Sequence, residues 1–243
     1  TYDAKPHVGT DVLVDVVRSI RQEVIALGGE VRFGARFERL VIENGAVAAV
    51  EYTKAGEKLL QSCRHVILAL GHSARDSFEQ LLAQGVNMER KPFSMGVRIE
   101  QLQTDIDRAQ YGRERGARPP ADYSLNVHLP DGSSAYTFCM CPGGQVVASA
   151  SEEERVVTNG MSYHARSGKN ANAAVVVSVG GADFANDPRR AIAFQRELEA
   201  KAYAAGRAAG AYAAPAENVQ SFLEGRGQLR IGSVQPTYDR GVT

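Results

Sequence analysis

The chain has 243 residues, of which 44% are apolar and 23% charged, so the composition excludes a disordered tail and favours a globular protein with a sizeable core. Lysine plus arginine and aspartate plus glutamate number 28 each, and this balance gives no electrostatic reason to expect binding to nucleic acid or to a membrane surface. The number of cysteines is odd, which argues against a disulfide-stapled secreted scaffold. The sequence also has no apolar run long enough for a membrane helix and no signal-peptide pattern, so we predict a soluble protein of the cytoplasm.

The first expected element is an amphipathic helix that Thr10 or Asp11 can cap. Apolar residues recur every three or four positions over residues 13–27, and Gly28-Gly29 ends the pattern. Asn44-Gly45 then predicts a hairpin, because this dipeptide accepts the positive φ values of a type I′ turn. The strands expected in this part are 30–33, the hairpin arms within 37–43 and 46–53, and 57–61.

The stretch from Cys63 to Phe78 is the clearest local pattern in the first half of the chain. Its apolar residues Val66 to Leu70 predict a buried strand, which stops at Gly71-His72-Ser73 before a helix over residues 74–82. In an open α/β sheet the carboxyl end of such a strand commonly borders a ligand, because backbone groups are free there. We therefore expect a ligand-binding edge at Gly71-His72-Ser73.

The second half of the chain is expected to be rich in strands. Residues 92–100 alternate between apolar and polar side chains, as in a half-buried strand, and residues 113–120 predict a charged surface loop. Further strands are expected at 123–129, 135–140, 145–149, 156–158 and 173–179, and helices at 188–205 and 219–223. We divide the chain into a first domain of residues 1–90 and a second domain of residues 91–243.

Short motifs follow one another along almost the whole chain. They are Lys5–Asp11 (KPHVGTD), Gly28–Gly34 (GGEVRFG), Leu68–Asp76 (LALGHSARD), Lys91–Phe93 (KPF), Phe138–Gly144 (FCMCPGG), Asn159–Tyr163 (NGMSY) and Asn170–Asn172 (NAN). In this order they resemble a family of bacterial FAD-dependent dehydrogenases, two-dinucleotide-fold flavoproteins whose substrates are largely unassigned.

The resemblance implies an α/β fold that becomes α+β in the second part. The first domain would be part of an FAD/NAD(P)-binding Rossmann-like domain with an antiparallel meander, and the second a sheet-rich substrate or cap domain with a long C-terminal helix. The implied activity is that of an oxidoreductase, a dehydrogenase that uses non-covalent FAD on a small-molecule substrate.

The glycine-rich dinucleotide fingerprint of the family is missing, and Gly168-Lys169 lacks the upstream glycine of a P-loop. Together with the start at Thr1 and the turn-like Gly241-Val242-Thr243, this predicts a central fragment. Flanking segments of its own polypeptide would complete the flavin site, and the fragment alone would be inactive and free of FAD. The alternative is a non-catalytic binding or scaffold module that keeps the architecture without the cofactor.

Gly71, His72 and Ser73 are the first candidate cofactor-binding residues. Glycine lets a ligand approach the backbone closely, while histidine and serine supply hydrogen-bonding groups. In the family this strand end lies beside the FAD, and His72 is also a candidate catalytic acid or base. The alternative is a strand-to-helix turn in which Ser73 merely caps the following helix.

Cys139 and Cys141 are the candidate catalytic thiols. Alternate residues of an extended strand face the same side, so the two sulfurs would be neighbours that relay electrons to a flavin or pack against its ring. The alternative is two inert core thiols, since cysteine is among the most buried residue types. Pro142, Gly143 and Gly144 predict a tight turn whose amides are open to the cofactor.

We expect no metal site. Cys139 and Cys141 are not spaced as a usual chelating pair, so a zinc site that includes His128 or His164 is the weaker alternative. Either histidine could also serve as an acid or base near neutral pH. The expected partners are the small-molecule substrate and the flanking segments, with neither nucleic acid nor membrane.

Overall fold

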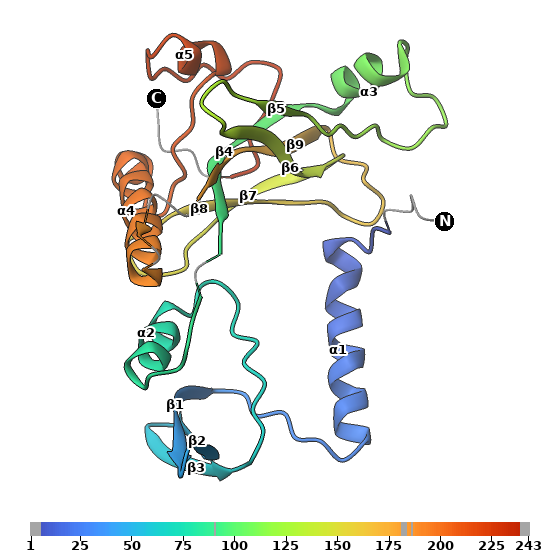
Figure 1. Ribbon diagram of the computed structural model, residues 1–243. Coiled ribbons are helices and arrows are strands. Elements are labelled where there is room, and N and C mark those ends of the chain that lie inside the picture. Colours follow the sequence, from blue (N-terminus) through green and yellow to red (C-terminus); the bar gives the residue numbers. More distant parts are fainter. Residues whose placement is uncertain (1–5, 90, 181–183, 186, 239–243) are drawn as a thin grey trace. The chain divides into compact units, whose positions relative to one another are not determined.

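The computed structural model describes residues 6–89, 91–180, 184–185 and 187–238, and Figure 1 labels its elements. The chain forms two compact units. The larger unit contains Thr1–Arg18, Lys91–Asp183 and Phe194–Thr243, and the smaller unit contains Ser19–Arg90 and Phe184–Ala193. Lys5 of the first motif and Gly241-Val242-Thr243 lie outside the described residues.

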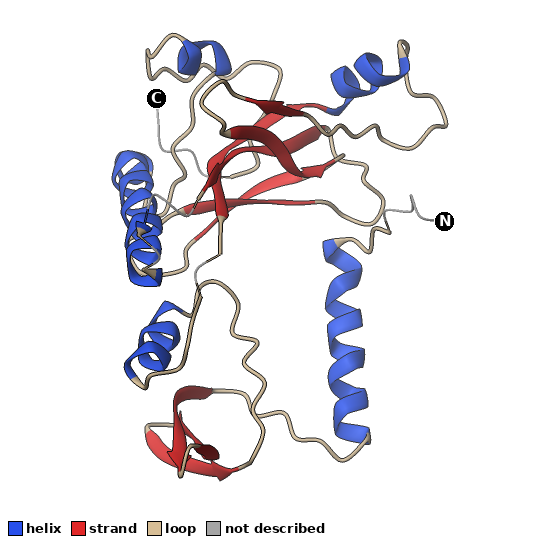
Figure 2. Cartoon of the chain, in the orientation of Figure 1, coloured by secondary structure: helices blue, strands red, loops and turns tan. Residues whose placement is uncertain are grey.

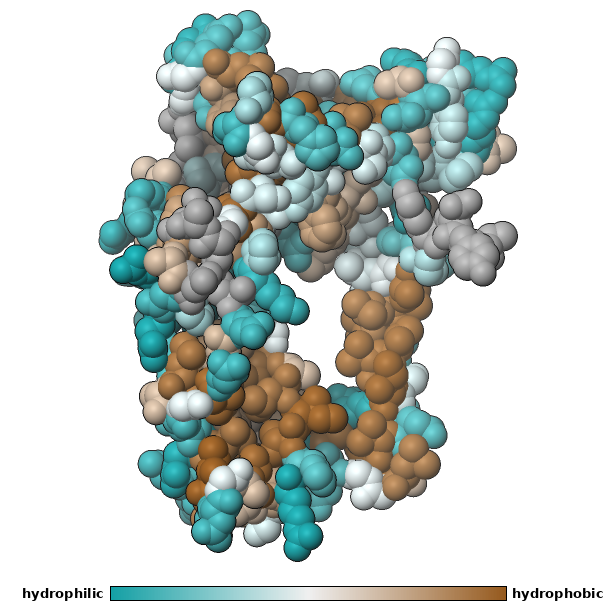
Figure 3. Space-filling view, in the orientation of Figure 1, coloured by the Kyte–Doolittle hydropathy of each residue, from teal (hydrophilic) through white to brown (hydrophobic). Residues whose placement is uncertain are grey.

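Helix α1 (Thr10–Ala26) confirms the first expected element. Its end is closed by the Gly28 N–H, which donates to the Ile25 carbonyl at 3.0 Å, and by the Gly29 N–H, which donates to the Val24 carbonyl at 2.8 Å. No residue of α1 is buried, and Figure 3 shows its apolar side chains at the surface. A helix with this apolar pattern normally packs against other elements, but α1 buries no side chain among the described residues.

The antiparallel meander expected in the first half is present in the smaller unit. It consists of β1 (Ala35–Glu43), β2 (Ala46–Lys54) and β3 (Glu57–Ser62), in the order β1-β2-β3. Asn44 and Gly45 have φ values of +51° and +77°, which confirms the type I′ turn. Leu40 and Ala49 are buried, so the meander has a covered side although most of its residues are exposed.

Helix α2 (Arg75–Ala83) contacts β1 in the same unit. Gln84, directly after the helix, accepts the Leu40 N–H at 3.1 Å and donates from its side-chain amide to the Leu40 carbonyl at 2.6 Å. The Gln84 side chain thus satisfies the backbone of one β1 residue as a neighbouring strand would.

Replacing Gln84 with alanine is expected to destabilise the smaller unit by about 1–3 kcal/mol, because both backbone groups of Leu40 lose their partner. The change is measured by urea unfolding followed by circular dichroism. The matched control is Gln80→Ala, on an exposed position of α2, which we expect to change stability by no more than about 0.5 kcal/mol. Equal effects of the two substitutions would contradict the role of the bridge.

Two expected strands are wrong. Residues 30–33 and Val66–Leu70 form no ladder with any strand in the described part of the chain. Ile67, in the middle of the apolar run, is 93% exposed. A strand requires a neighbour for its backbone N–H and C=O groups, and an apolar run alone does not supply one.

All strand pairs that the structure describes are antiparallel. The described residues therefore form a mixed fold of helices and antiparallel sheets. The Rossmann-like parallel sheet is not seen among them and stays a prediction.

The larger unit is built on a four-stranded antiparallel sheet with the order β4-β9-β6-β5 (Figure 2). Its strands are β4 (Phe93–Leu102), β5 (Asn126–His128), β6 (Ser134–Cys141) and β9 (Asn170–Val179), and β7 (Gln145–Ser149) pairs separately with β8 (Val157–Met161). The first four residues of β9 are buried, whereas Val175 and Val177, which also lie between β4 and β6, are exposed. On β4, the predicted alternation is imperfect: Val97 is 54% exposed, whereas Arg98 is partly buried.

The helices of the second half of the described chain are α3 (Gln103–Tyr111), α4 (Pro188–Gly206), the short η2 (Arg207–Ala209) and α5 (Val219–Leu223). Residues 188–193 of α4 belong to the smaller unit and the rest of α4 to the larger unit. Helix α3 was not expected, and it begins where β4 ends. The start of α4 at Pro188 agrees with the preference of proline for the first helical position.

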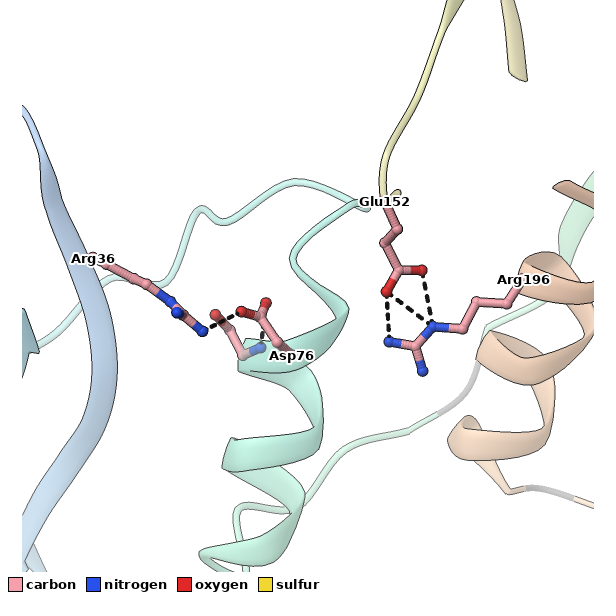
Figure 4. A network of polar contacts seen from close by, with 5 residues as sticks. Arg36, Asp76, Glu152 and Arg196 are labelled. Atoms are coloured by element: carbon pink, nitrogen blue, oxygen red, sulfur yellow. Dashed lines mark hydrogen bonds and ion pairs between the residues drawn. The ribbon is translucent and has the colours of Figure 1, made fainter. Parts of the chain in front are cut away.

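Two ion pairs connect elements within the units, and both are drawn in Figure 4. In the larger unit, Arg196 of α4 binds Glu152 with its Nε 2.9 Å from Oε2 and its Nη2 2.8 Å from Oε1. In the smaller unit, Arg36 of β1 binds Asp76 of α2 at 2.9 Å. The second pair is exposed and contributes little, but the bidentate first pair helps to fix α4 on its unit.

Candidate functional site

A pocket of about 250 Å³ lies in the larger unit, where the first residues of the chain meet the ends of β6 and β8. Its apolar wall is formed by Val8, Leu13, Met140, Pro142 and Met161, and its polar side chains are His7, Thr10, Cys141, Ser162 and Arg166. None of the described residues that line it is acidic. Pockets for drug-sized ligands hold about 300–1,000 Å³, so this one suits a smaller molecule.

The wall nearest the N-terminus is fixed by hydrogen bonds between the KPHVGTD motif and residues 162–164. The Thr10 N–H donates to the Ser162 carbonyl at 3.0 Å, and the His164 N–H donates to the Asp11 carboxylate at 2.8 Å. The His164 N–H also holds the pKa of the Asp11 carboxyl below its usual value. Gly9, at φ +90°, lies so close to the His164 backbone that a Cβ there would overlap it. Two motifs far apart in the sequence thus form one wall.

Two histidines in this wall have their tautomers fixed by backbone carbonyls. His7 donates from Nε2 to the Tyr163 carbonyl at 3.0 Å, and His164 donates from Nδ1 to the Val8 carbonyl at 2.8 Å, because a carbonyl can only accept. The rings stack with their centroids 6.4 Å apart. In the neutral form His7 therefore keeps Nδ1 as a free proton acceptor, and His7 is the histidine that lines the pocket.

The two cysteines do not stand in a regular strand, so the alternation from which their common facing was expected does not apply. Between Phe138 and Cys141, strand β6 has one residue more than β9 opposite it, and Cys139 takes a φ of +47° in the resulting bulge. Cys139 is exposed, whereas Cys141 lines the pocket and donates from its thiol to the Cys139 carbonyl at 3.3 Å. Both thiols are free.

Burial raises the pKa of the Cys141 thiol, and the guanidinium charges of Arg98 and Arg166 only partly oppose this shift. The Cys141 thiol is therefore protonated near neutral pH. A buried, protonated thiol is a poor nucleophile. Packing and weak hydrogen bonding describe its chemistry better than nucleophilic attack.

Arg98 approaches the same place from β4. Its Nη1 donates to the Asn172 Oδ1 at 2.6 Å and to the Cys139 carbonyl at 3.4 Å. Asn172 is fully buried and pairs with Cys141 in the sheet register. Gly160 leaves the space for this contact, because a Cβ on residue 160 would overlap the Arg98 Nη1 and the Asn172 Oδ1.

The turn at Pro142, Gly143 and Gly144 is present, but all three residues are buried. The Gly143 N–H donates to the side-chain carbonyl of Gln103 at 2.7 Å, so the expectation of an open amide is wrong for this residue. The Pro142 carbonyl accepts the Ser162 hydroxyl at 3.0 Å. The structure thus gives the turn a packing role, and its binding to a cofactor stays a prediction.

Gly71, His72 and Ser73 belong to the smaller unit, and each is exposed. Gly71 has a φ of +72°, and nothing lies within 4 Å of the position a Cβ would take. The Ser73 hydroxyl and the His72 Nε2 are 3.3 Å apart. The residue at the N-cap of α2 is Ala74, which makes no side-chain capping bond. Open space thus surrounds Gly71, whereas the Ser73 carbonyl accepts the Arg75 N–H at 2.9 Å, and cofactor binding at this turn stays a prediction.

The two other candidate histidines do not line the pocket. His128, on β5, bonds through Nδ1 to the Ser134 hydroxyl at 2.9 Å and is exposed. His164 lies in the pocket wall but does not line the cavity. Within the described ranges, no group of three or more His, Cys, Asp or Glu residues is arranged to hold a metal ion.

Of the candidate residues named from the sequence, Cys141 and Pro142 line the pocket in the larger unit. Gly71, His72 and Ser73 lie in the smaller unit. Sequence reasoning did not single out His7, Arg98 or Arg166. His7 stands in the first motif, which was a usable signal, but Arg98 and Arg166 carried none, because their proximity to Cys141 depends on strand pairing and a loop.

Residues 92–243 match a family model described as FAD-dependent protein, C-terminal domain-like. The chain is 43% identical over 244 aligned positions to an uncharacterized protein of Clostridium beijerinckii, a match that covers 99% of this chain and 45% of that protein. The chain thus spans less than half the length of this relative. Among solved structures, a triple mutant of the flavin-dependent brominase Bmp2 matches 77% of this chain and 38% of its own, at 12% identity and a TM-score of 0.34. None of the described helices has the length and apolarity needed to cross a membrane.

Proposed function

The chain belongs to this family of FAD-dependent proteins, and from that membership we propose that it is the core of an FAD-dependent oxidoreductase of the dehydrogenase type. FAD would be bound non-covalently and would supply the hydride or electron transfer. The match over residues 92–243 is the observation that carries the proposal. In it, residues 1–90 hold part of the flavin, residues 91–243 hold a small-molecule substrate, and the protein works in the cytoplasm.

The described residues fit an edge of an FAD site but not a complete one. The exposed backbone at Gly71 can be approached by a flat or phosphorylated group, and His72 and Ser73 add hydrogen-bonding side chains. Gly143 offers no free amide, because Gln103 already occupies it. The pocket beside Cys141 is too small for a whole dinucleotide.

Flanking segments of the polypeptide would supply the rest of the site. Val66–Leu70 is an extended apolar segment with unpaired backbone, and α1 exposes its apolar side chains. Strands from the flanking segments would pair with the backbone of Val66–Leu70 and cover the apolar face of α1. The paired strands would form the parallel sheet predicted from the sequence. The length of the relative, of which this chain spans 45%, supports this.

The pocket in the larger unit would receive the substrate. His7 Nδ1 can accept a proton from the substrate, since Nε2 is held by the Tyr163 carbonyl. Cys141, protonated near neutral pH, would pack against the bound molecule. The catalytic roles of His72 and Cys139 are part of the same proposal.

The test is a titration with FAD, followed by flavin fluorescence, of this chain and of the same protein extended at both ends by its natural sequence. We expect only the extended protein to bind FAD. An extended protein that folds but takes up no FAD would overturn the proposal and favour the non-catalytic module.

The binding edge is tested in the extended protein by Gly71→Ala and its control Gly56→Ala. Both glycines have positive φ and open space around them, so the two substitutions impose a similar backbone strain. We expect only Gly71→Ala to weaken FAD binding, by about tenfold. Equal affinities of the two variants would remove Gly71 from the site.

A further inference from the structure

Two arginines beside the Cys141 pocket form no ion pair within the described residues, and the acidic group in the pocket wall, Asp11, instead accepts the His164 N–H. Arg166 lines it, and Arg98 lies behind Gly160. The charges of both guanidiniums reach the Cys141 thiol, which lines the same pocket. Within the described residues neither arginine forms an ion pair: the acceptors of Arg98 are an amide and a carbonyl oxygen.

The nearest acidic side chain on β4 does not change this balance. Glu100 lies two residues from Arg98, but no ion pair joins them in the part of the chain that the structure describes. Burial raises the pKa of Glu100, and only a hydrogen bond from Asn170 opposes that shift. Glu100 is thus not the counter-charge of Arg98.

Three buried hydrogen-bond donors of Arg98, Arg166 and Asn172 also have no acceptor. Asn172 is 0% exposed, and its side-chain Nδ2 has no hydrogen-bond partner; the same holds for the buried Nε atoms of Arg98 and Arg166. Buried donors without acceptors are costly, and they are uncommon in folded proteins. All three are donors without an acceptor, and Arg166, the one of the three residues that lines the pocket, carries a charge that an anionic acceptor would match.

The remaining wall of the pocket is apolar. Leu13, Met140 and Met161 line it, and methionine side chains adapt their shape to a bound molecule. The first turn of α1 also borders the pocket, with Thr10 as its first residue. The walls therefore combine one charged side with one apolar side.

We propose that this pocket binds a small organic acid, with its carboxylate at the Arg166 and Arg98 side and its apolar body against Leu13, Met140 and Met161. An anion between the two guanidiniums would supply their missing counter-charge and accept their hydrogen bonds. Binding rests on the pocket alone, whereas the identification of the acid as the substrate rests on the proposed function.

The probe is benzoate, which combines a carboxylate with a small apolar ring, and the neutral comparison molecule is benzamide. The chain has four methionines, so selective ¹³C-methyl labelling gives few signals, two of which come from the pocket residues Met140 and Met161. We expect benzoate to shift both signals and to leave that of Met88, in the smaller unit, unchanged. Benzamide is expected to bind about tenfold more weakly, because it lacks the charge.

Arg166→Gln removes one guanidinium and is expected to weaken benzoate binding about tenfold. The control is Lys169→Gln, which removes an exposed positive charge a few residues away and is expected to leave binding unchanged. No shift of Met140 and Met161 up to the solubility limit of benzoate, or equal affinities for benzoate and benzamide, would overturn the proposal. If Arg166→Gln fails to fold, the comparison of the two probes on the unchanged chain decides.

The two proposals fail separately. Benzoate binding needs no FAD, so charge-dependent binding to a protein that takes up no FAD would keep the acid site and remove the oxidoreductase. If the extended protein binds FAD but its pocket binds benzoate and benzamide equally, the oxidoreductase proposal stands and the acid site is removed.

Discussion

Replacing Gln103 with leucine is expected to destabilise the larger unit by about 3–5 kcal/mol, because the Gly143 N–H and the Ala121 carbonyl lose their partner and the Asp107 carboxylate loses one of its hydrogen bonds. The Gln103 Oε1 accepts the Gly143 N–H at 2.7 Å. Its Nε2 donates to the Asp107 carboxylate at 2.8 Å and to the Ala121 carbonyl at 3.0 Å. Gln103 is 4% exposed, so water cannot replace these bonds without a change in structure.

The effect is measured by urea unfolding followed by circular dichroism, with hydrogen exchange of the Gly143 amide as the local readout. The control is Gln110→Leu, an exposed position of the same helix, for which we expect a change of no more than about 0.5 kcal/mol. A Gln103→Leu variant as stable as the control, with an equally protected Gly143 amide, would show that the network does not hold the turn.

Gly143→Ala is expected to cost about 2–5 kcal/mol, from two sources. Alanine is strained at a φ of +54°, and its Cβ would overlap the Arg166 carbonyl. The overlap with Arg166 arises because the Gly168 N–H donates to the Gly143 carbonyl at 3.1 Å, which holds the backbone of the Arg166 loop close to Gly143. The loop that carries Arg166 would have to move, so benzoate binding is expected to weaken as well.

Gly132→Ala separates the two sources. Gly132 has a φ of +85° but open space around it, so its substitution should cost only the backbone strain of about 1–2 kcal/mol. The difference between the two midpoints of urea unfolding measures the overlap with the Arg166 loop. If both substitutions cost the same, close packing is not the reason for glycine at position 143.

Local patterns in the sequence predicted those elements that depend on neighbours along the chain. The Asn44-Gly45 turn, the end of α1 at Gly28 and the helix over Val219–Leu223 were expected and are present. Val66–Leu70 has the composition of a buried strand but no ladder here. Composition encodes the tendency to be buried, whereas a strand forms only where a second strand satisfies its backbone.

The candidate site could be predicted only in part for the same reason. Cys141 and Pro142 stand in a recognisable motif, and both line the pocket. The bulge at Cys139 interrupts the alternation on which the expected facing of the two thiols rested, and a single extra residue in a strand pair is not visible in one sequence. Arg98 reaches Cys141 only because β4 and β6 both pair with β9.

The hydrogen bonds between the KPHVGTD motif and residues 162–164 have a consequence for the order in which the protein can fold during synthesis. His7 and its acceptor Tyr163 are 156 positions apart, and Ser19–Arg90 of the smaller unit is made in between. The first residues leave the ribosome early but find their partners only after the strands of the larger unit have been translated. Closing so long a loop costs entropy, so Ser19–Arg90, the segment of the smaller unit made first, has time to fold before the loop closes. The wall that contains His7 would then be among the last parts of the chain to form.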